Sequence, residues 1–289
     1  MAPILSDSLL TPEEEYEYLV DHGKLPETDV MLPSGYLSVT QVGTFIRCPK
    51  QYEFRYVKGI ISPPQARIAE GSAMHKALEA GHRERMVSGT TAPLDVLMDA
   101  HNDAWKDEKQ RVEVWDEESP ESLILKRARV FLSEYYKHFL PHIEPIGVEK
   151  RFWATVEDSI PVLGYIDLIA VDSNPRLRHR DEPEKEVVDY KVIAKTYSKN
   201  EVDGNLQLTM YSHATGIPRV RFDMFVKTKT PDVKSLSSIR TSQDWKWAQR
   251  VFSDIGHAIS KGVFPPTMPT EWCCTKKWCG YFPFCRGAV

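Results

Sequence analysis

The feature that most constrains this 289-residue chain is a pair of apolar segments that each enclose one aspartate. Asp167 lies in VLGYIDLIAVD and Asp189 lies in VVDYKVIA, and a charged insertion, residues 173–186, separates the two segments. Runs this rich in valine and isoleucine predict neighbouring strands. Because an ionised carboxylate without a partner is costly to bury, two of them near each other indicate a bound cation.

Lys191 extends this pattern. It follows Asp189 at a spacing of two, which puts both side chains on the same face of one strand. An aspartate beside a strand that carries Asp-x-Lys predicts a site for a hard divalent ion and a water, with the lysine orienting that water or neutralising charge. A buried salt bridge between Lys191 and one aspartate is the alternative interpretation of this segment alone.

Composition sets broad limits on the kind of protein. At 42% hydrophobic and 27% charged residues, it is ordinary for a soluble globular chain. No apolar run approaches the roughly 18 residues of a membrane span and the N-terminal residues lack a secretory pattern, so we expect a cytoplasmic protein that does not bind membranes. The net charge of -4 argues against coating nucleic acid by bulk attraction, but it allows an enzyme with a local basic channel.

The cysteines are unevenly distributed along the chain. Four of the five lie in the last seventeen residues, and the fifth, Cys48, is far away in FIRCPKQYEF. The four are Cys273, Cys274, Cys279 and Cys285. In a cytoplasmic chain this distribution favours a metal ion or a cluster over disulfides.

Helices are predicted before the aspartate segments. Residues 1–35 are acidic and predict a peripheral arm, with room for one short helix. A capping box, Ser38-x-x-Gln41, opens a helix that ends before Pro49. Two helical patterns at 94–112 and 121–140 form a helical insertion, residues 94–140.

A further predicted helix starts at Gly71 and carries His75 and Glu79 on one side. A single histidine on a helix is often only a packed or surface residue, so this position by itself assigns no function.

From Gly147 the periodicity changes to two. GVEKRFWATV predicts the first strand, with Glu149, Arg151 and Trp153 on one face, and this strand forms an antiparallel meander with the two aspartate segments.

Helix and strand patterns continue to the cysteine tail. NLQLTMYSHATG predicts a helix that places Gln207 one turn from Tyr211, and Gly216 ends it. RVRFDMFVKT predicts a strand, and a last amphipathic helix begins at Ser242.

These residues, in this order, resemble the RecB-like branch of the PD-(D/E)XK nuclease superfamily. The similarity covers about residues 36–285. Its motifs are Gly71-x-x-x-His75 with Glu79, then Glu149, Asp167 within GYID, Asp189-x-Lys191, and Gln207-x-x-x-Tyr211. The resemblance implies an α/β fold with a restriction-endonuclease-like core, in which helices flank a mixed central sheet, and a single nuclease domain over residues 36–289.

The resemblance also suggests roles for these residues. Asp167 and Asp189 would bind Mg²⁺ or Mn²⁺, with His75 and the backbone carbonyl of Tyr190 as further ligands. Lys191 would position or activate the attacking water. Gln207 and Tyr211 would hold the DNA backbone or the Lys191 side chain, and Glu79 and Glu149 are accessory candidates.

Some members of this branch, the AddB helicase-nucleases and the CRISPR-associated RecB-like exonucleases, carry an iron-sulphur cluster. One cysteine before the nuclease core and three after it bind the cluster. By this resemblance Cys48, Cys274, Cys279 and Cys285 hold a [4Fe-4S] cluster that joins residues 265–289 to Cys48. Either Cys273 or Cys274 could be the third ligand, because they are adjacent, and a zinc ion is the alternative to the cluster.

The resemblance implies a DNA exonuclease that removes nucleotides from ends and prefers single strands. It would act in recombination, repair, replication or phage DNA metabolism. The alternatives are a CRISPR adaptation nuclease and a non-catalytic DNA-binding scaffold of the same fold. The sequence has no G-x-x-x-x-G-K-[ST] loop, so unwinding would require a partner such as a helicase, and a recombination or adaptation protein is a further candidate partner.

Overall fold

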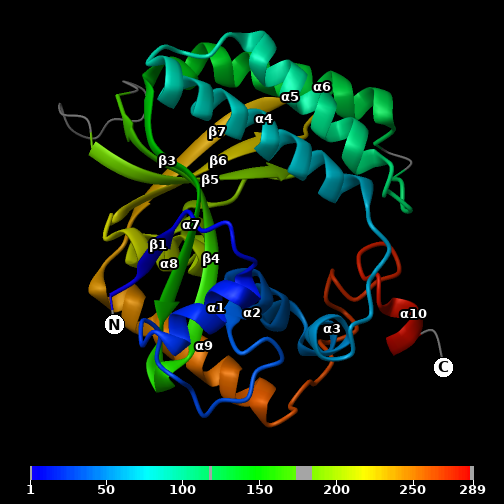
Figure 1. The fold of residues 1–289 in the computed structure, drawn as a ribbon. Helices are drawn as coiled ribbons and strands as arrows, with labels where there is room; N and C mark the ends of the chain where they lie inside the picture. The colour runs from blue at the N-terminus through cyan, green and yellow to red at the C-terminus, as the bar shows by residue number, and fades with distance from the viewer. Residues whose placement is uncertain (1, 117–118, 174–183, 287–289) are drawn as a thin grey trace. The chain divides into compact units, whose positions relative to one another are not determined.

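The computed structural model describes residues 2–116, 119–173 and 184–286 (Figure 1). Most of the charged insertion predicted at 173–186 therefore lies outside the described residues. The chain forms two compact units. The terminal unit comprises Met1–Pro63, Arg151–Gly164 and Ser242–Val289, and the central unit comprises Pro64–Lys150 and Tyr165–Thr241.

The fold is mixed α/β, with a seven-stranded, mostly antiparallel sheet flanked by helices. The strand order is β1-β3-β4-β5-β6-β7, and β2 pairs with β4. The strands are β1 (Ile4–Ser6), β2 (Leu37–Ser38), β3 (Ile143–Thr155), β4 (Pro161–Asp172), β5 (Glu184–Ile193), β6 (Arg219–Val226) and β7 (Asp232–Ile239). This arrangement confirms the predicted class, a mixed central sheet flanked by helices.

In the central unit, the two aspartate segments are neighbouring strands, as predicted. β4 and β5 pair antiparallel with Leu168 opposite Val188. Asp167 directly precedes Leu168 and Asp189 directly follows Val188, so the two aspartates are next to this pair on the adjacent strands. β5 pairs parallel with β6, which places Lys191 opposite Met224. The buried aspartates are thus fixed by the pairing of β4 with β5.

Three long helices of the central unit build its main core. They are α4 (Ala66–Ser88), α5 (Leu94–Lys109) and α6 (Glu121–His138), and Figure 1 shows them over β5, β6 and β7. Leu78 of α4 and Phe131 of α6 belong to one buried cluster with Val188 of β5. Two shorter helices, α7 (Lys199–Asp203) and α8 (Leu206–Thr215), follow β5, and Gly216 ends α8 in the left-handed conformation, as predicted.

The terminal unit has its own small core around Trp153. Its helices are α1 (Pro12–Asp21), α2 (Val39–Arg47), α3 (Pro49–Tyr52), α9 (Ser242–Ser260) and α10 (Phe282–Cys285). Trp153 packs with Tyr36 and Leu163, and its indole nitrogen donates to Glu15 of α1 at 3.0 Å. The capping box predicted for α2 is present, because the Ser38 hydroxyl accepts from the Gln41 backbone and the Gln41 side chain accepts from the Ser38 backbone.

Several element boundaries differ from the predictions. The helix expected from Gly71 begins at Ala66, and the strand expected from Gly147 begins at Ile143. Strand β7 was missed, because its sequence DVKSLSSI carries serines where alternating apolar residues would have revealed it. None of the helices in the described part of the chain is long and apolar enough to cross a membrane.

One buried ionic network stabilises the central unit. The Arg221 guanidinium of β6 is fully buried, and its nitrogens lie 2.5 Å from Asp172, 2.6 Å from Glu186 and 2.9 Å from Asp223. Removing one partner from a buried ionic group leaves charge without compensation.

We expect Arg221→Met to lower the free energy of unfolding by about 3–5 kcal/mol, because it removes the cation shared by three buried carboxylates. Urea unfolding followed by circular dichroism measures this. Arg250→Met, on the exposed side of α9, is the matched control and should change stability by less than about 0.5 kcal/mol. Equal urea midpoints for the two variants would contradict the prediction.

Candidate metal centre

Three ligating side chains converge in the central unit. His75 of α4, Glu149 of β3 and Asp167 of β4 each offer an atom, and these atoms all lie within 4.8 Å of one another. His75 Nδ1 is 3.4 Å from Asp167 Oδ1, and His75 Nε2 is 3.0 Å from the backbone carbonyl oxygen of Tyr190. Two carboxylates, an imidazole and a nearby carbonyl form a donor set that fits a divalent cation.

Glu149 reaches this group through an unusual backbone conformation. Its φ is 51°, in the left-handed region that a residue with a side chain rarely adopts. Such a conformation costs of order 1–3 kcal/mol, and strain of this kind is concentrated at functional sites. It also interrupts the regular alternation from which we predicted Glu149, Arg151 and Trp153 on one face.

The charges in this group are unbalanced in the absence of a cation. Burial raises the pKa of Glu149 to about 7, and the negative charges of Asp167 and Glu79 act in the same direction. Burial disfavours the charged form of His75, but the Asp167 carboxylate outweighs it and raises the pKa of His75 to about 8. Both groups therefore titrate near neutral pH, where a bound cation would displace their protons.

Asp189 and Lys191 form an ion pair beside this group. The Lys191 ammonium lies 2.6 Å from Asp189 Oδ2 and donates to Gln207 Oε1 at 3.0 Å, and Gln207 Nε2 donates to the Tyr211 hydroxyl at 2.6 Å. Burial, with Asp167, raises the pKa of Asp189 to about 6 although Lys191 opposes this. Burial alone would lower the pKa of Lys191, but Asp189 and Asp167 outweigh it and raise that pKa.

The structure places the predicted ligands as follows. His75, Asp167 and the Tyr190 carbonyl lie together, and Glu149, predicted only as an accessory residue, completes the close group. Asp189 is outside this group in the described part of the chain and pairs with Lys191, as in the alternative interpretation of the sequence. Asp189 nevertheless remains close to Asp167, because the negative charge of Asp167 contributes to the raised pKa of Asp189.

Glu79 lies one turn after His75 on α4. Its carboxylate is 2.8 Å from the Lys76 ammonium and 2.8 Å from the Arg83 guanidinium. Those two cations lower the pKa of Glu79 although burial opposes them, and the Glu79 charge contributes to the raised pKa of Glu149. Glu79 therefore acts on the group through its charge rather than as one of the three close ligands.

Tyr190 connects the site to the core, and sequence reasoning missed the residues that hold it. Its backbone N–H donates to Asp167 Oδ2 at 2.8 Å. Its hydroxyl lies 2.8 Å from His82 Nε2 and 3.1 Å from the Tyr135 hydroxyl, and all three side chains are buried. The spacing of seven between His75 and His82, which is two helical turns, was a signal that could have identified His82.

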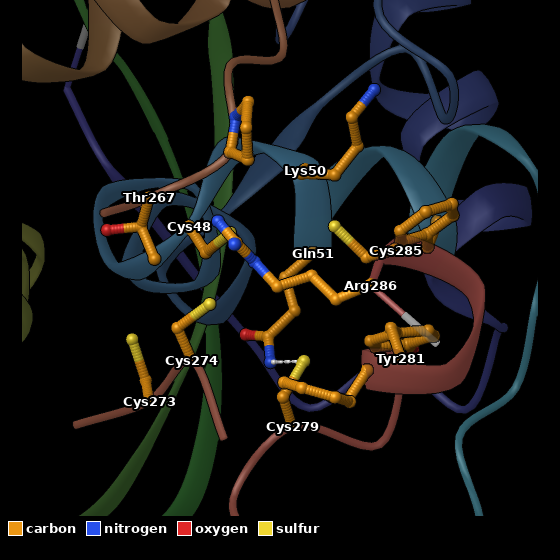
Figure 2. Close-up of a pocket in the computed structure, with 13 residues that line it drawn as sticks. Cys48, Lys50, Gln51, Thr267, Cys273, Cys274, Cys279, Tyr281, Cys285 and Arg286 are labelled. Carbon is orange, nitrogen blue, oxygen red and sulfur yellow. Dashed lines mark hydrogen bonds between the residues drawn. The ribbon is translucent and has the colours of Figure 1, made fainter. Parts of the chain in front are cut away.

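The cysteines gather around one cavity in the terminal unit. Figure 2 shows all five on its lining, with Gln51 and Arg286, and the cavity is partly open to solvent. Among the described residues, no three cysteine sulphurs lie within 4.8 Å of one another. The Cys273 thiol donates to the Arg47 carbonyl at 3.8 Å, and Gln51 Nε2 donates to Cys279 Sγ at 3.5 Å.

The titration of Cys285 indicates which thiols are its neighbours. Burial raises its pKa, and further increases come from Cys48, Cys274 and Cys279. These are the four residues predicted from the sequence. Cys273 also lies close to two of these thiols, since Cys48 and Cys274 both raise its pKa, but its own thiol donates to the Arg47 carbonyl.

A family model described as the PD-(D/E)XK nuclease superfamily matches residues 36–286. The comparison with curated proteins gave no match.

Two solved structures resemble the chain at low identity. One is a "putative exonuclease" from Eubacterium rectale, with 13% identity, 92% of each chain covered and a TM-score of 0.49. The other is the protein SSO0001, with 12% identity, 95% of this chain and 94% of that chain covered, and a TM-score of 0.36. Similarity at this level carries no information about activity.

Because both Glu149 and His75 must lose a proton to bind a metal, we expect Mn²⁺ affinity to rise between about pH 6 and 8. The pKa of Glu149 is about 7 and that of His75 about 8, so protonation of either competes with the metal on the acid side. The rise should reach about tenfold per pH unit for each proton displaced. Isothermal titration calorimetry in two buffers of different ionisation enthalpy measures both the affinity and the proton release.

The variant for this experiment is Glu149→Gln, which keeps the side-chain shape and removes the charge. It should weaken Mn²⁺ binding by about 10- to 100-fold and release fewer protons. Glu144→Gln, an exposed position on the same strand, is the matched control. Wild-type affinity in Glu149→Gln would exclude Glu149 as a ligand.

Proposed function

Because the chain belongs to the PD-(D/E)XK nuclease superfamily, we propose that it is a deoxyribonuclease of the RecB-like branch that requires Mg²⁺ or Mn²⁺. The observation that carries this proposal is the convergence of His75, Glu149 and Asp167 within 4.8 Å, in the unit that also holds the Asp189–Lys191 pair. A module that only binds DNA has no need of this set, since three buried or half-buried ligands and an ion pair are costly to assemble.

The residues present fit a hard divalent cation. Asp167, Glu149, His75 and the Tyr190 carbonyl would hold it, and Asp189 is a further carboxylate nearby. When bound, such an ion stabilises the extra negative charge of phosphodiester hydrolysis and lowers the pKa of a bound water.

Lys191 supplies a second positive charge. Its pKa is raised, because the two aspartates outweigh the effect of burial, and this favours a protonated lysine over one that accepts a proton. We therefore assign it to orienting the attacking water and neutralising the phosphate. Gln207 holds the ammonium at 3.0 Å and is itself held by Tyr211, so both are positioning residues for Lys191.

The substrate class and pathway follow from the sequence resemblance and remain predictions. We propose removal of nucleotides from DNA ends, with single strands preferred, in recombination, repair, replication or phage DNA metabolism. A role in CRISPR adaptation is the alternative pathway. A helicase or a recombination protein as partner, and a cytoplasmic location, also remain predictions.

The direct test is cleavage of end-labelled linear and circular DNA, single- and double-stranded, with Mg²⁺, with Mn²⁺ and with EDTA. Asp167→Asn and Lys191→Met should each reduce the rate about a hundredfold or more, since each removes charge stabilisation at the reacting phosphate. Asp232→Asn and Lys137→Met, exposed positions of the central unit, are matched controls and should cut at the wild-type rate.

Three outcomes separate the alternatives. Wild-type cleavage by a folded Asp167→Asn protein would disprove the assigned site. Tight DNA binding with no cleavage in either metal would identify a non-catalytic scaffold. Circular single strands cut as fast as linear ones would show that the enzyme needs no end.

We also propose a [4Fe-4S] cluster bound by Cys48, Cys274, Cys279 and Cys285. The cavity that they line supports it, as does the influence of the other three on Cys285. A single zinc ion with Zn–S bonds of about 2.3 Å needs its sulphurs close together. A cluster holds each thiolate on a different iron, so its sulphurs lie farther apart than those around a single ion. No three cysteine sulphurs of the described residues lie within 4.8 Å of one another, which disfavours a preformed site for a single ion.

The choice of Cys274 over Cys273 rests on local contacts. Cys273 is buried and its thiol donates to the Arg47 carbonyl, whereas Cys274 is one of the neighbours that raise the pKa of Cys285. The four ligands come from both ends of the chain, so the cluster would close a very long loop and act as a structural crosslink.

We expect anaerobically purified protein to be brown and to contain iron. Cys285→Ala should lose the colour and the iron and should be less stable by about 4–5 kcal/mol, by analogy with a disulfide across a long loop. Cys273→Ala is the matched control and should keep both colour and iron. Visible absorption, iron and zinc analysis and thermal unfolding measure these, and a colourless wild-type protein that contains zinc and no iron would overturn the cluster.

A further inference from the structure

The cysteine tail exposes large aromatic side chains that the metal sites do not use. Trp272 is 62% exposed, Trp278 is 37% exposed and Phe284 is 56% exposed. The Trp272 and Trp278 rings lie 6.0 Å apart at 80°, and the Lys277 ammonium lies 5.6 Å from the centre of the Trp278 ring. Exposed aromatic side chains gathered in this way mark interaction surfaces more often than chance.

The residues that follow these two tryptophans are hydrogen-bonded to another segment of the chain. Trp272 directly precedes Cys273 and Trp278 directly precedes Cys279. The Cys273 thiol donates to the Arg47 carbonyl, and Cys279 Sγ accepts from Gln51. Each tryptophan is therefore bonded through the backbone to a residue that is held by a hydrogen bond. Aromatic rings held in place before binding lose little conformational entropy when a ligand arrives.

The surrounding charge is strongly positive. Residues 47–58 and 270–286 pack together, since Phe54 stacks on Tyr281 at 5.7 Å and also contacts Phe284. Together the two segments carry seven lysines and arginines and two acidic residues, in a chain whose net charge is -4. Lys276 is among the exposed basic residues. We call the exposed part of the tail that carries Trp272, Lys276, Lys277 and Trp278 the aromatic-basic surface.

A protein partner is the less favoured occupant of this surface. The central part of a protein–protein interface is usually depleted in lysine, whereas here two lysines lie between the tryptophans in the sequence. Duplex DNA buries its base faces, so it offers phosphates but nothing for the rings to stack on. Unpaired strands offer both, because each base presents a π-face and each nucleotide a phosphate.

We propose that the aromatic-basic surface binds single-stranded DNA, with bases stacked on Trp272 and Trp278 and phosphates paired with Lys276 and Lys277. The choice of DNA over RNA rests on the proposed nuclease function, because stacking alone does not distinguish them. The surface belongs to the terminal unit, whereas His75, Glu149 and Asp167 belong to the central unit. It is therefore a substrate-binding site additional to the metal centre.

The experiment measures binding of fluorescent oligothymidine of about 16 nucleotides by anisotropy, using full-length Asp167→Asn protein without added divalent metal. Trp272→Ala should weaken binding about tenfold and leave the salt dependence unchanged, because it removes stacking only. Lys276→Ala should lower the slope of log affinity against log salt by about 0.7, because it removes one phosphate contact. Trp272→Phe should bind nearly as well as the parent.

Trp247→Ala and Lys246→Ala, exposed positions on α9 of the same unit, are the matched controls and should bind like the parent. Metal content and thermal unfolding are measured for every variant. If Trp272→Ala also loses metal, the salt slope of Lys276→Ala decides the question. Unchanged affinity in Trp272→Ala together with an unchanged slope in Lys276→Ala would overturn the proposal.

Three further arms test the ligand. Duplex DNA of the same length should bind more weakly than the single strand. Equal affinity for the two would show that the tryptophans do not stack on unpaired bases. Oligouridine bound more tightly than oligothymidine, with the same dependence on Trp272, would overturn the assignment to DNA. Self-association that depends on Trp272, with no effect on DNA binding, would make the surface a protein interface.

The two proposals fail separately. If the surface variants bind DNA like the parent and Asp167→Asn loses metal-dependent cleavage, the proposed nuclease function stands and the proposed DNA-binding surface is overturned. If DNA binding depends on Trp272 but the wild-type protein cleaves DNA in neither metal, the DNA-binding surface stands and the proposed nuclease function is overturned.

Discussion

The burial of two carboxylates on adjacent strands is the constraint on which the site depends. Asp189 is 1% exposed and Asp167 is 8% exposed, and desolvation at this depth disfavours both charges. The protein offsets this cost locally: the Tyr190 N–H and His75 serve Asp167, and the Lys191 ammonium serves Asp189. These partners come from β5 and from α4, so the strand and the helix must be packed together before the charges are tolerated.

Strand β5 provides this placement through its alternation. Val188 and Tyr190 belong to the cluster built with α4 and α6, and Asp189 and Lys191 occupy the alternate positions of the strand. Tyr190 is connected to the site by its backbone and to the core by its hydroxyl, which His82 and Tyr135 hold. A change in core packing would therefore move the carbonyl and the N–H that Tyr190 presents to His75 and Asp167.

Features that depend on residues close together in the sequence could be predicted, whereas irregular backbone and long-range pairing could not. The aspartates at β4 and β5 were visible because charge inside a valine-rich run is unusual, and the α2 capping box was visible because its two partners are three residues apart. Glu149 could be suspected but not placed, since nothing in GVEKRFW indicates a left-handed residue within a strand. Strands β1 and β2 are too short to show periodicity, and their pairing depends on residues more than a hundred positions away.

The net charge of the chain does not indicate where a polyanion would bind it. The two cysteine-bearing segments hold a surplus of five positive charges, so the remainder of a chain with a net charge of -4 carries a surplus of nine negative ones. Salt screens charge beyond about 8 Å at physiological ionic strength, so a phosphate close to the basic segments responds mainly to them and little to the distant acidic residues. The acidic remainder instead disfavours binding elsewhere, which concentrates a strand on the basic segments rather than spreading it over the protein.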